Sequence, residues 1–392
     1  MIEIDEASKK IFDQTLPISI KEIDLLEARG FVLAENIFSD RDYPPFNRAT
    51  MDGFAISCAN FSREKKYKLV QKIFAGDHKN IQIEANECIS IMTGAALPNG
   101  LDLVIKKEES QIVDKDCIEF HTEKIKSFSN IAIEGEDLKA NQLVLESGSL
   151  MNSQNISLLA SLGKPKIKIF APPKIMIFST GNEIISIESM PEKNQIRDSN
   201  SFYLRSELSN YNIHPESKII PDDFELISAE IKNANPFNII LITGGVSEGD
   251  SDFIPKALID LGYEIIFHKV KMKPGKPFLF AKNLENQFVF GIPGNPLSVQ
   301  VVWKVFIENF LRKILKLNTE SKQKKLFEGV RFKKTNFTEF FLFRYKKSKS
   351  SIEEVRHTGS GDIKSPSFAD GIAIHPSHLN EIKNIDLEII EW

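Results

Sequence analysis

A glycine-rich turn crowded with carboxylates is the first place in this sequence where chemistry is expected. The apolar run NIILIT, residues 238–243, leads into GGVSEGDSD, residues 244–252. The small residues of the turn are Gly244, Gly245, Ser247 and Gly249, and the acidic ones are Glu248, Asp250 and Asp252. Small residues permit exposed N–H groups that bind anions, and a divalent cation bridging a phosphate to carboxylates would explain the negative charge. Asp252, nearest the predicted helix DFIPKALIDLG, is the best ligand candidate. A plain turn in which Asp252 caps the helix is the simpler alternative.

A lysine-rich turn, KVKMKPGKPFLF at residues 269–280, is the second candidate. Its lysines are Lys269, Lys271, Lys273 and Lys276. If VKM forms a strand, the first three share one face. Two prolines would stiffen the turn and hold Lys273 and Lys276 in place, which suits a multiply charged oxyanion. A solvated basic edge is an equally good alternative.

Other polar residues follow predicted strands or open predicted helices. They are Glu183 in GNEI, Asp198, Ser199 and Asn200 in IRDSNS, Asp222 and Asp223 before FELISAEIKNA, Asp52 in TMDGF and Thr93 in IMTGA. Helix capping accounts for part of this set, and Asp-Gly is also a common turn. The histidines show no metal-ligand spacing, and neither a GxSxG elbow nor a Walker loop occurs.

The composition is that of a globular protein with several domains. The chain has 392 residues, of which 42% are hydrophobic and 27% charged, and a formal net charge of -4. This charge gives no support for a nucleic-acid or membrane partner. The cysteines form no CxxC pair, which disfavours zinc and disulfide frameworks. With no signal peptide and no apolar run long enough for a membrane helix, a cytoplasmic location is expected.

The elements that must position these residues change in kind along the chain. Residues 1–45 are predicted to be helical, with ISIKEIDLLEARGF as the most amphipathic piece and Gly30 as its C-cap. Short apolar runs between residues 65 and 130 predict strands, and residues 149–163 return to a helical pattern. A β-rich domain, residues 46–134, is therefore expected to be inserted into a discontinuous linker and dimerisation domain of residues 1–45 and 135–170.

Residues 171–317 alternate between strand and helix patterns, which predicts a three-layer α/β/α domain with a mostly parallel sheet. Ligands of such sheets bind beyond the carboxyl ends of the strands, where both GNEI and the glycine-rich turn lie. After PGNP, the clearest helix is expected to begin with Asn295 as N-cap and Pro296 as its first residue. Residues 318–392 are predicted to form a fourth, β-rich domain, so the fold class is α/β multidomain.

The order of these motifs resembles that of the molybdopterin molybdenumtransferase family, which includes MoeA and the gephyrin E domain, over nearly the whole chain. The motifs are PPFNRATMDGFAI, IMTGAALPNGLDLVIKKEE, IEGEDLKANQLVLESGSLM, IFSTGNEI, IRDSN, ITGGVSEGDSDF, KPGKPFLF, GIPGNPLSVQ and GSGDIKSPSFADGIAIHP. The resemblance implies an enzyme of molybdenum cofactor biosynthesis that takes adenylylated molybdopterin and molybdate and releases AMP with the help of Mg2+. It also implies a homodimer whose active site lies between the sheet domain of one subunit and the β-rich domain of the other.

The resemblance also implies roles for individual residues. Those implied in catalysis are Asp252, Glu183, Lys273, Lys276 and Asp52, with Asp252 and Glu183 as magnesium ligands. Those implied in substrate binding are Thr93, Gly244, Gly245, Ser247, Gly249, Asp222, Asp137, Pro293, Pro296 and Ser298. Magnesium near Asp252 would polarise the pyrophosphate, and the lysines would stabilise molybdate or departing phosphate.

Three positions depart from the family pattern, and two other functions stay open. Glu248 replaces a small apolar residue, Ala49 a common Ser, and Asn182 a frequent Asp. An adenylyltransferase would share the sheet domain and its GG loop but lack the MDGF and IMTGA segments. A gephyrin-like scaffold would need none of the site residues.

Overall fold

The computed structural model of the chain describes residues 1–77, 81–122, 125–247, 252–317, 323–347 and 350–392. The chain divides by its internal contacts into two units. Met1–Glu35 and Ser147–Trp392 form one, which we call the large unit, and Asn36–Glu146 form the small unit. The finer division into four domains stays a prediction.

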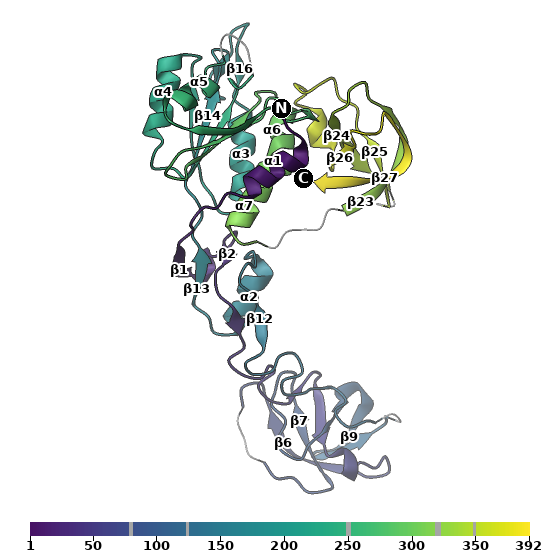
Figure 1. Cartoon of the computed structure of the whole chain (residues 1–392). Helices are drawn as coiled ribbons and strands as arrows, with labels where there is room; N and C mark the ends of the chain where they lie inside the picture. Colours follow the sequence, from purple (N-terminus) through teal and green to yellow (C-terminus); the bar gives the residue numbers. More distant parts are fainter. Residues whose placement is uncertain (78–80, 123–124, 248–251, 318–322, 348–349) are drawn as a thin grey trace. The chain divides into compact units, whose positions relative to one another are not determined.

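The large unit contains a six-stranded sheet in the order β17-β14-β18-β22-β21-β19 (Figure 1). Its strands are β14 (Ile175–Thr180), β17 (Glu216–Ile220), β18 (Ile239–Thr243), β19 (Glu264–His268), β21 (Leu279–Lys282) and β22 (Phe288–Ile292). The pairs β17–β14, β14–β18 and β18–β22 are parallel, whereas β22–β21 and β21–β19 are antiparallel. The predicted mostly parallel sheet is therefore confirmed.

Both faces of this sheet are covered by helices. The helices are α3 (Asn200–Ser209), α4 (Phe224–Asn233), α5 (Ile254–Asp260) and α6 (Pro296–Val302), which continues through a π-helical turn (Trp303–Ile307) into α7 (Glu308–Ile314). In β18, Ile239 and Leu241 join one hydrophobic core with α3 and α6, and Ile240 and Ile242 join another with α4 and α5. Successive side chains of a strand point to opposite faces, and both faces are buried here, which explains the continuous apolar run of β18.

The N-terminal segment is mostly extended, which corrects the prediction that residues 1–45 are helical. Its elements are α1 (Ile4–Phe12), β1 (Ile20–Asp24), a 3₁₀ turn (Leu25–Glu27) and β2 (Val32–Leu33). Two later elements of the large unit, α2 (Ser153–Ser161) and β13 (Lys166–Phe170), lie in the segment from residue 147 to 170. The piece predicted to be an amphipathic helix contains β1, which pairs antiparallel with β13. A partner strand far along the chain thus overrides the local helical pattern. Gly30, with φ of +82°, lies in a turn and does not end an α-helix.

The small unit contains a six-stranded sheet in the order β8-β5-β7-β6-β10-β9. Its strands are β5 (Gly53–Ile56), β6 (Tyr67–Ile73), β7 (Glu87–Ile91), β8 (Leu103–Lys106), β9 (Ser110–Asp114) and β10 (Cys117–Phe120). Two short pairs accompany it, β4 (Arg48–Ala49) with β11 (Ile131–Ala132) and β3 (Ile37–Phe38) with β12 (Leu143–Leu145). In β5, Phe54 and Ile56 face one core and Ala55 the other, so both faces of this sheet are buried.

The C-terminal part of the large unit is a closed sheet, because β24 pairs with both β25 and β26. We call it the C-terminal barrel. Its strands are β23 (Gln323–Phe332), β24 (Thr338–Tyr345), β25 (Ser351–Glu354), β26 (Gly371–His375) and β27 (Glu381–Glu391). A short strand of the lysine-rich turn, β20 (Met272–Lys273), is added to β24. Within the described ranges, no helix has the length and apolar character needed to cross a bilayer.

Candidate active site

The glycine-rich turn after β18 is packed against the ends of the neighbouring strands. Gly244 has φ of +93°, and a Cβ there would lie 2.5 Å from the carbonyl oxygen of Thr180. Gly245 has φ of +61°, so both positions need a conformation that glycine adopts without strain. The N–H of Gly244 donates to the carbonyl of Ile292 at 3.0 Å. The turn is thereby fixed at the carboxyl ends of β14 and β22, the edge where sheets of this kind bind ligands.

The PGNP motif between β22 and α6 lies beside this turn. A Cβ on Gly294 would be 3.5 Å from the Cα of Gly244. The side chain of Asn200, from α3, donates to the carbonyl of Gly294 at 2.7 Å. Asn295 occupies the N-cap position as predicted, but its side chain donates to Oγ of Ser360 at 3.1 Å and does not cap the helix. A loop of the C-terminal barrel therefore borders the motif.

Three acidic side chains lie at the same edge, namely Glu183 after β14, Asp222 after β17 and Asp252 before α5. The N–H of Asp222 donates to Oδ1 of Asn182 at 3.1 Å. Burial raises the pKa of the Asp222 carboxyl, and the negative charges of Glu183 and Asp252 raise it further. Repulsion between like charges favours either a shared proton or a bound cation.

Magnesium fits this acidic edge only together with a phosphate. Among the residues with described positions, no three His, Cys, Asp or Glu side chains form a set that could hold a metal ion. Mg2+ needs only one or two carboxylates when phosphate oxygens and waters complete its shell. The donor set therefore suits a cation that arrives with, or is completed by, a phosphorylated substrate.

The lysine-rich turn differs from the prediction in its first half. Lys269 has φ of +75°, which interrupts the extended backbone, and only Met272–Lys273 forms a strand. The prediction that Lys269, Lys271 and Lys273 share one strand face is therefore wrong. Lys271 forms an ion pair with Glu3.

Lys273 and Lys276 are both exposed on the second half of this turn. Lys273 pairs in register with Glu339 of β24. The Nζ of Lys276 lies 5.9 Å from the ring centroid of Phe337. The two lysines therefore contact the C-terminal barrel, while remaining accessible to a charged ligand.

In the small unit, Asp52 and Thr93 are in direct contact although 41 residues separate them. The backbone N–H and the hydroxyl of Thr93 both donate to Oδ1 of Asp52, each at 2.8 Å. These hydrogen bonds, followed by the positive charges of Lys107 and Lys72, lower the pKa of the exposed Asp52 carboxyl. The pair is thus an ionised acceptor on the surface of the unit.

Two more contacts join the motif loops around this pair. Gly94 donates its N–H to the carbonyl of Ala49, and the N–H of Glu134 donates to Oδ1 of Asn47, each at 2.8 Å. The segments NRATMD, MTGAALP and IEGEDL, which are far apart in the sequence, therefore form one surface of the small unit.

Two family profiles match most of the chain. Residues 2–163 match the MoeA N-terminal region (domain I and II), and residues 176–313 match the probable molybdopterin binding domain. A molybdopterin molybdenumtransferase of Haemophilus influenzae is 32% identical over 317 residues, which are 80% of this chain and 78% of that protein. This chain belongs to the MoeA family.

Another relative and a solved structure extend the match of this MoeA family member. A putative molybdopterin biosynthesis protein of Methanocaldococcus jannaschii is 31% identical over 92% of this chain and 89% of that protein. The crystal structure of a MoeA molybdopterin biosynthesis protein from Pyrococcus horikoshii covers 100% of both chains with a TM-score of 0.83 and 25% identity. The predicted family, fold class and assignment to molybdenum cofactor biosynthesis are confirmed.

The remaining predicted site residues of this MoeA family member differ in their exposure. Ser247 and Asp137 are exposed, Pro296 is half-buried, and Pro293 and Ser298 are buried. Asp252 lies one residue before Phe253, the N-cap of α5, and so does not occupy the capping position. Glu248, Gly249 and Asp250 lie outside the described residues.

Several neighbours of the predicted residues were missed by sequence reasoning. They are Lys72 and Lys107 near Asp52, Ser360 at the PGNP motif, and Phe337 and Glu339 at the lysines. No spacing in the sequence relates these residues to their partners, because strand pairing brings them together. Of these neighbours, Ser360 could have been found from the sequence, since it lies in the family motif GSGDIKSPSFADGIAIHP.

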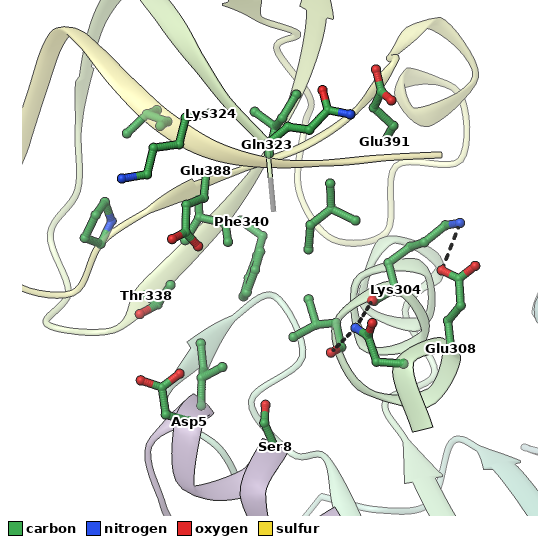
Figure 2. A pocket seen from close by; sticks show the side chains of 18 of the residues that line it. Asp5, Ser8, Lys304, Glu308, Gln323, Lys324, Thr338, Phe340, Glu388 and Glu391 are labelled. Atoms are coloured by element: carbon green, nitrogen blue, oxygen red, sulfur yellow. Dashed lines mark hydrogen bonds and ion pairs between the residues drawn. The ribbon is translucent and has the colours of Figure 1, made fainter. Parts of the chain in front are cut away.

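A cavity of about 1080 Å³ elsewhere in the large unit contains none of the predicted site residues. It lies between α1, the helix from the π turn into α7, and strands of the C-terminal barrel (Figure 2). Lys304, only 7% exposed, pairs there with Glu207 at 3.2 Å and Glu308 at 3.1 Å. Both carboxylates also accept hydrogen bonds, Glu207 from Nε1 of Trp303 at 3.0 Å and Glu308 from the hydroxyl of Tyr211 at 2.7 Å, so these groups are engaged within the helix packing.

Proposed function

We propose that this protein is a molybdopterin molybdenumtransferase. It would take adenylylated molybdopterin and molybdate, cleave the adenylate, insert molybdenum at the dithiolene and release AMP. The observation that carries the proposal is the meeting of the glycine-rich turn, PGNP and three carboxylates at one sheet edge, in a chain of the MoeA family. A scaffold function would not require these groups to meet.

The residues of the sheet edge would bind and orient the pyrophosphate. The N–H of Gly244 is bonded to the carbonyl of Ile292, so the N–H of Gly245, which follows it in the turn, would be the one to bind a phosphate oxygen. Lys273 and Lys276 would neutralise molybdate or the departing phosphate. Both residues are exposed, so an anion can reach them from solvent.

Asp252 and Glu183, with Asp222 beside them, would hold magnesium. The raised pKa of the Asp222 carboxyl, caused by burial and then by the two neighbouring charges, supports this assignment, because a cation would relieve the repulsion. When bound, magnesium supplies electrophilic activation of the pyrophosphate. Asn182 keeps an oxygen near this edge through its bond to the N–H of Asp222.

The active site would be shared between two subunits of a homodimer. Asp52 and Thr93 of one subunit would face the sheet edge of the other, so that an ionised carboxylate and a hydroxyl complete the site. The support is that the small-unit motifs gather around an exposed Asp52, whose pKa is lowered by its hydrogen bonds from Thr93. Neither a membrane nor a nucleic-acid partner is needed, and a cytoplasmic location stays a prediction.

The direct test is turnover of adenylylated molybdopterin by the purified full chain. AMP release and cofactor formation are measured with and without molybdate and with and without magnesium. We expect both products only when molybdate and magnesium are present together with the substrate. Binding of the substrate without either product, under all four conditions, would refute the proposed activity and favour a scaffold.

A further inference from the structure

The turn that joins β23 to β24 in the C-terminal barrel lies against the lysine-rich turn of the sheet domain. We call residues 333–339, which comprise this turn and the first two residues of β24, the support turn. β20 and β24 pair in parallel there, with Met272 opposite Thr338 and Lys273 opposite Glu339. The N–H of Thr338 also donates to the carbonyl of Lys271 at 3.3 Å. Backbone pairing therefore fixes the register between the two turns.

The support turn is itself held rigidly by a buried lysine. Lys333 is 7% exposed, and its Nζ donates to the carbonyls of Phe337 at 2.9 Å and Ser377 at 2.8 Å. Its backbone N–H donates to the carbonyl of Asn380 at 2.9 Å. A buried ammonium that donates hydrogen bonds to main-chain carbonyls stabilises one conformation of the turn. The turn is thus a fixed platform for whatever lies on it.

Glu339 places a fixed negative charge opposite Lys273. It is 6% exposed, and its two oxygens accept from Nη2 of Arg331 at 2.9 Å and from Oγ1 of Thr335 at 3.0 Å. Burial opposes its ionisation, but hydrogen bonds from Arg331 and Thr335 and the charges of Arg331 and Lys273 outweigh burial and lower its pKa. The carboxylate is therefore ionised beside Lys273.

The geometry lets Glu339 orient the Lys273 side chain without forming an ion pair with it. Both residues are described, and they form no ion pair within 4.0 Å, whereas Arg331 does pair with Glu339 at 2.9 Å. Because Arg331 and Thr335 occupy its oxygens, the carboxylate attracts the Lys273 ammonium through space only. The ammonium stays available for an anion.

Phe337 of the support turn also attracts a lysine, Lys276, without forming an ion pair with it. Its half-buried ring lies 5.9 Å from the Nζ of Lys276, within the range of a cation–π attraction. An aromatic face attracts a cation but accepts no proton and competes weakly with a charged ligand. Both lysines of the KPGK turn are thus attracted by side chains of one element from a different part of the chain.

We propose that the support turn is a positioning element for the oxyanion site, with Glu339 orienting Lys273 and Phe337 orienting Lys276. The inference rests on the proposed function, since it concerns the lysines assigned to molybdate or phosphate. Under this proposal the C-terminal barrel contributes to anion binding, although the barrel itself supplies no group that touches the anion. The barrel acts by restricting where two flexible side chains can go.

A double-mutant cycle in the full chain tests the proposal through equilibrium binding of two probes, inorganic pyrophosphate and molybdate. Glu339→Gln should weaken binding of at least one probe by roughly five- to tenfold, with no such loss in a Lys273→Met background. Phe337→Leu should behave likewise against Lys276→Met. The matched control is Glu353→Gln, which removes a carboxylate of the same barrel that pairs with Arg344 at 2.6 Å, and it should leave binding unchanged.

The outcomes separate positioning from a general effect on the barrel. An equal loss in the presence and absence of Lys273, or no loss for either probe, would overturn the proposal. If Glu339→Gln melts at a clearly lower temperature, Glu339→Asp keeps the charge and should retain most of the coupling to Lys273. Failure of the wild-type chain to form cofactor would refute the proposed activity, while the binding cycle would still decide the role of the support turn.

Discussion

One oxygen of Asp52 accepts two hydrogen bonds from a single residue, Thr93, whose N–H and hydroxyl both lie 2.8 Å from Oδ1. The bonds from Thr93, ahead of the charges of Lys107 and Lys72, lower the pKa of the carboxyl. Asp52 is therefore ionised at all pH values at which the protein is expected to work. Its second oxygen is not engaged by Thr93 and can serve a ligand.

Replacing Thr93 by Val should raise the pKa of Asp52 toward its usual value of about 3.9, because the hydroxyl donor is lost and the N–H remains. Carbon-detected NMR titration of the Asp52 carboxyl measures this. A carboxyl whose pKa is lower in the folded than in the unfolded chain stabilises the fold at pH values above its unfolded pKa. This stabilisation is lost as the pH falls through the folded-state pKa. The variant should therefore lose part of the acid-side pH dependence of stability.

The matched control is Ser127→Ala, which removes a hydroxyl from a comparable contact with Asp102 in the same unit. We expect this control to leave AMP release unchanged, and Thr93→Val to lower it at least about tenfold. Equal activity of the two variants would remove the pair from the active site.

Mixing two inactive variants tests whether the active site is shared. In a symmetric dimer, a heterodimer of an Asp52→Ala chain and an Asp252→Ala chain keeps one intact site of two. Random mixing should then restore about a quarter of wild-type AMP release. The control is Asp252→Ala mixed with Lys276→Ala, which alter the same unit and should restore nothing. Absence of recovery in verified heterodimers would place the whole site within one chain.

Gly244→Ala should destabilise the sheet domain and abolish AMP release. A Cβ at this position would lie 2.5 Å from the Thr180 carbonyl oxygen, and φ is +93°, so strain and a clash add to about 3 kcal/mol or more. Gly262→Ala is the control, because φ is +82° there and nothing lies within 4 Å of the added carbon. It should cost only about 1 kcal/mol. Urea unfolding with equal midpoints for both variants would show that the turn can relax.

His375 should make stability depend on pH. It is fully buried, and burial, followed by the positive charge of Arg331, lowers its pKa to about 4. Nη1 of Arg331 donates to Nδ1 at 2.9 Å, so Nε2 carries the proton and donates to the carbonyl of Leu379 at 2.9 Å. The neutral ring is therefore the one that fits.

Because the folded-state pKa lies below the unfolded value, the unfolded chain binds the proton first as the pH falls. Stability should decrease between about pH 6.5 and pH 4, by up to about 3 kcal/mol. Thermal unfolding over this range measures it. His375→Gln should flatten that part of the profile, and an unchanged slope in the variant would assign the dependence to other groups.

The periodic elements were predictable because their information is local. The alternating strands and helices of residues 171–317 and the glycine-rich turn at their edge follow from apolar spacing and turn residues. The helix predicted around Ile20–Asp24 failed because pairing with Lys166–Phe170 is a contact between distant segments. The shared strand face of the lysines failed because Lys269 adopts a positive φ.

The sequence by itself determined the family, the layered sheet and the residue types available at its edge. Tertiary structure decided which of those residues meet, since each contact depends on pairing between strands far apart along the chain. The bond of Thr93 to Asp52 requires β7 to lie beside β5, and the charge of Glu339 reaches Lys273 only because β24 accepts β20 as a neighbour. Such pairings depend on the whole hydrophobic core and leave no signature in the local spacing of residues.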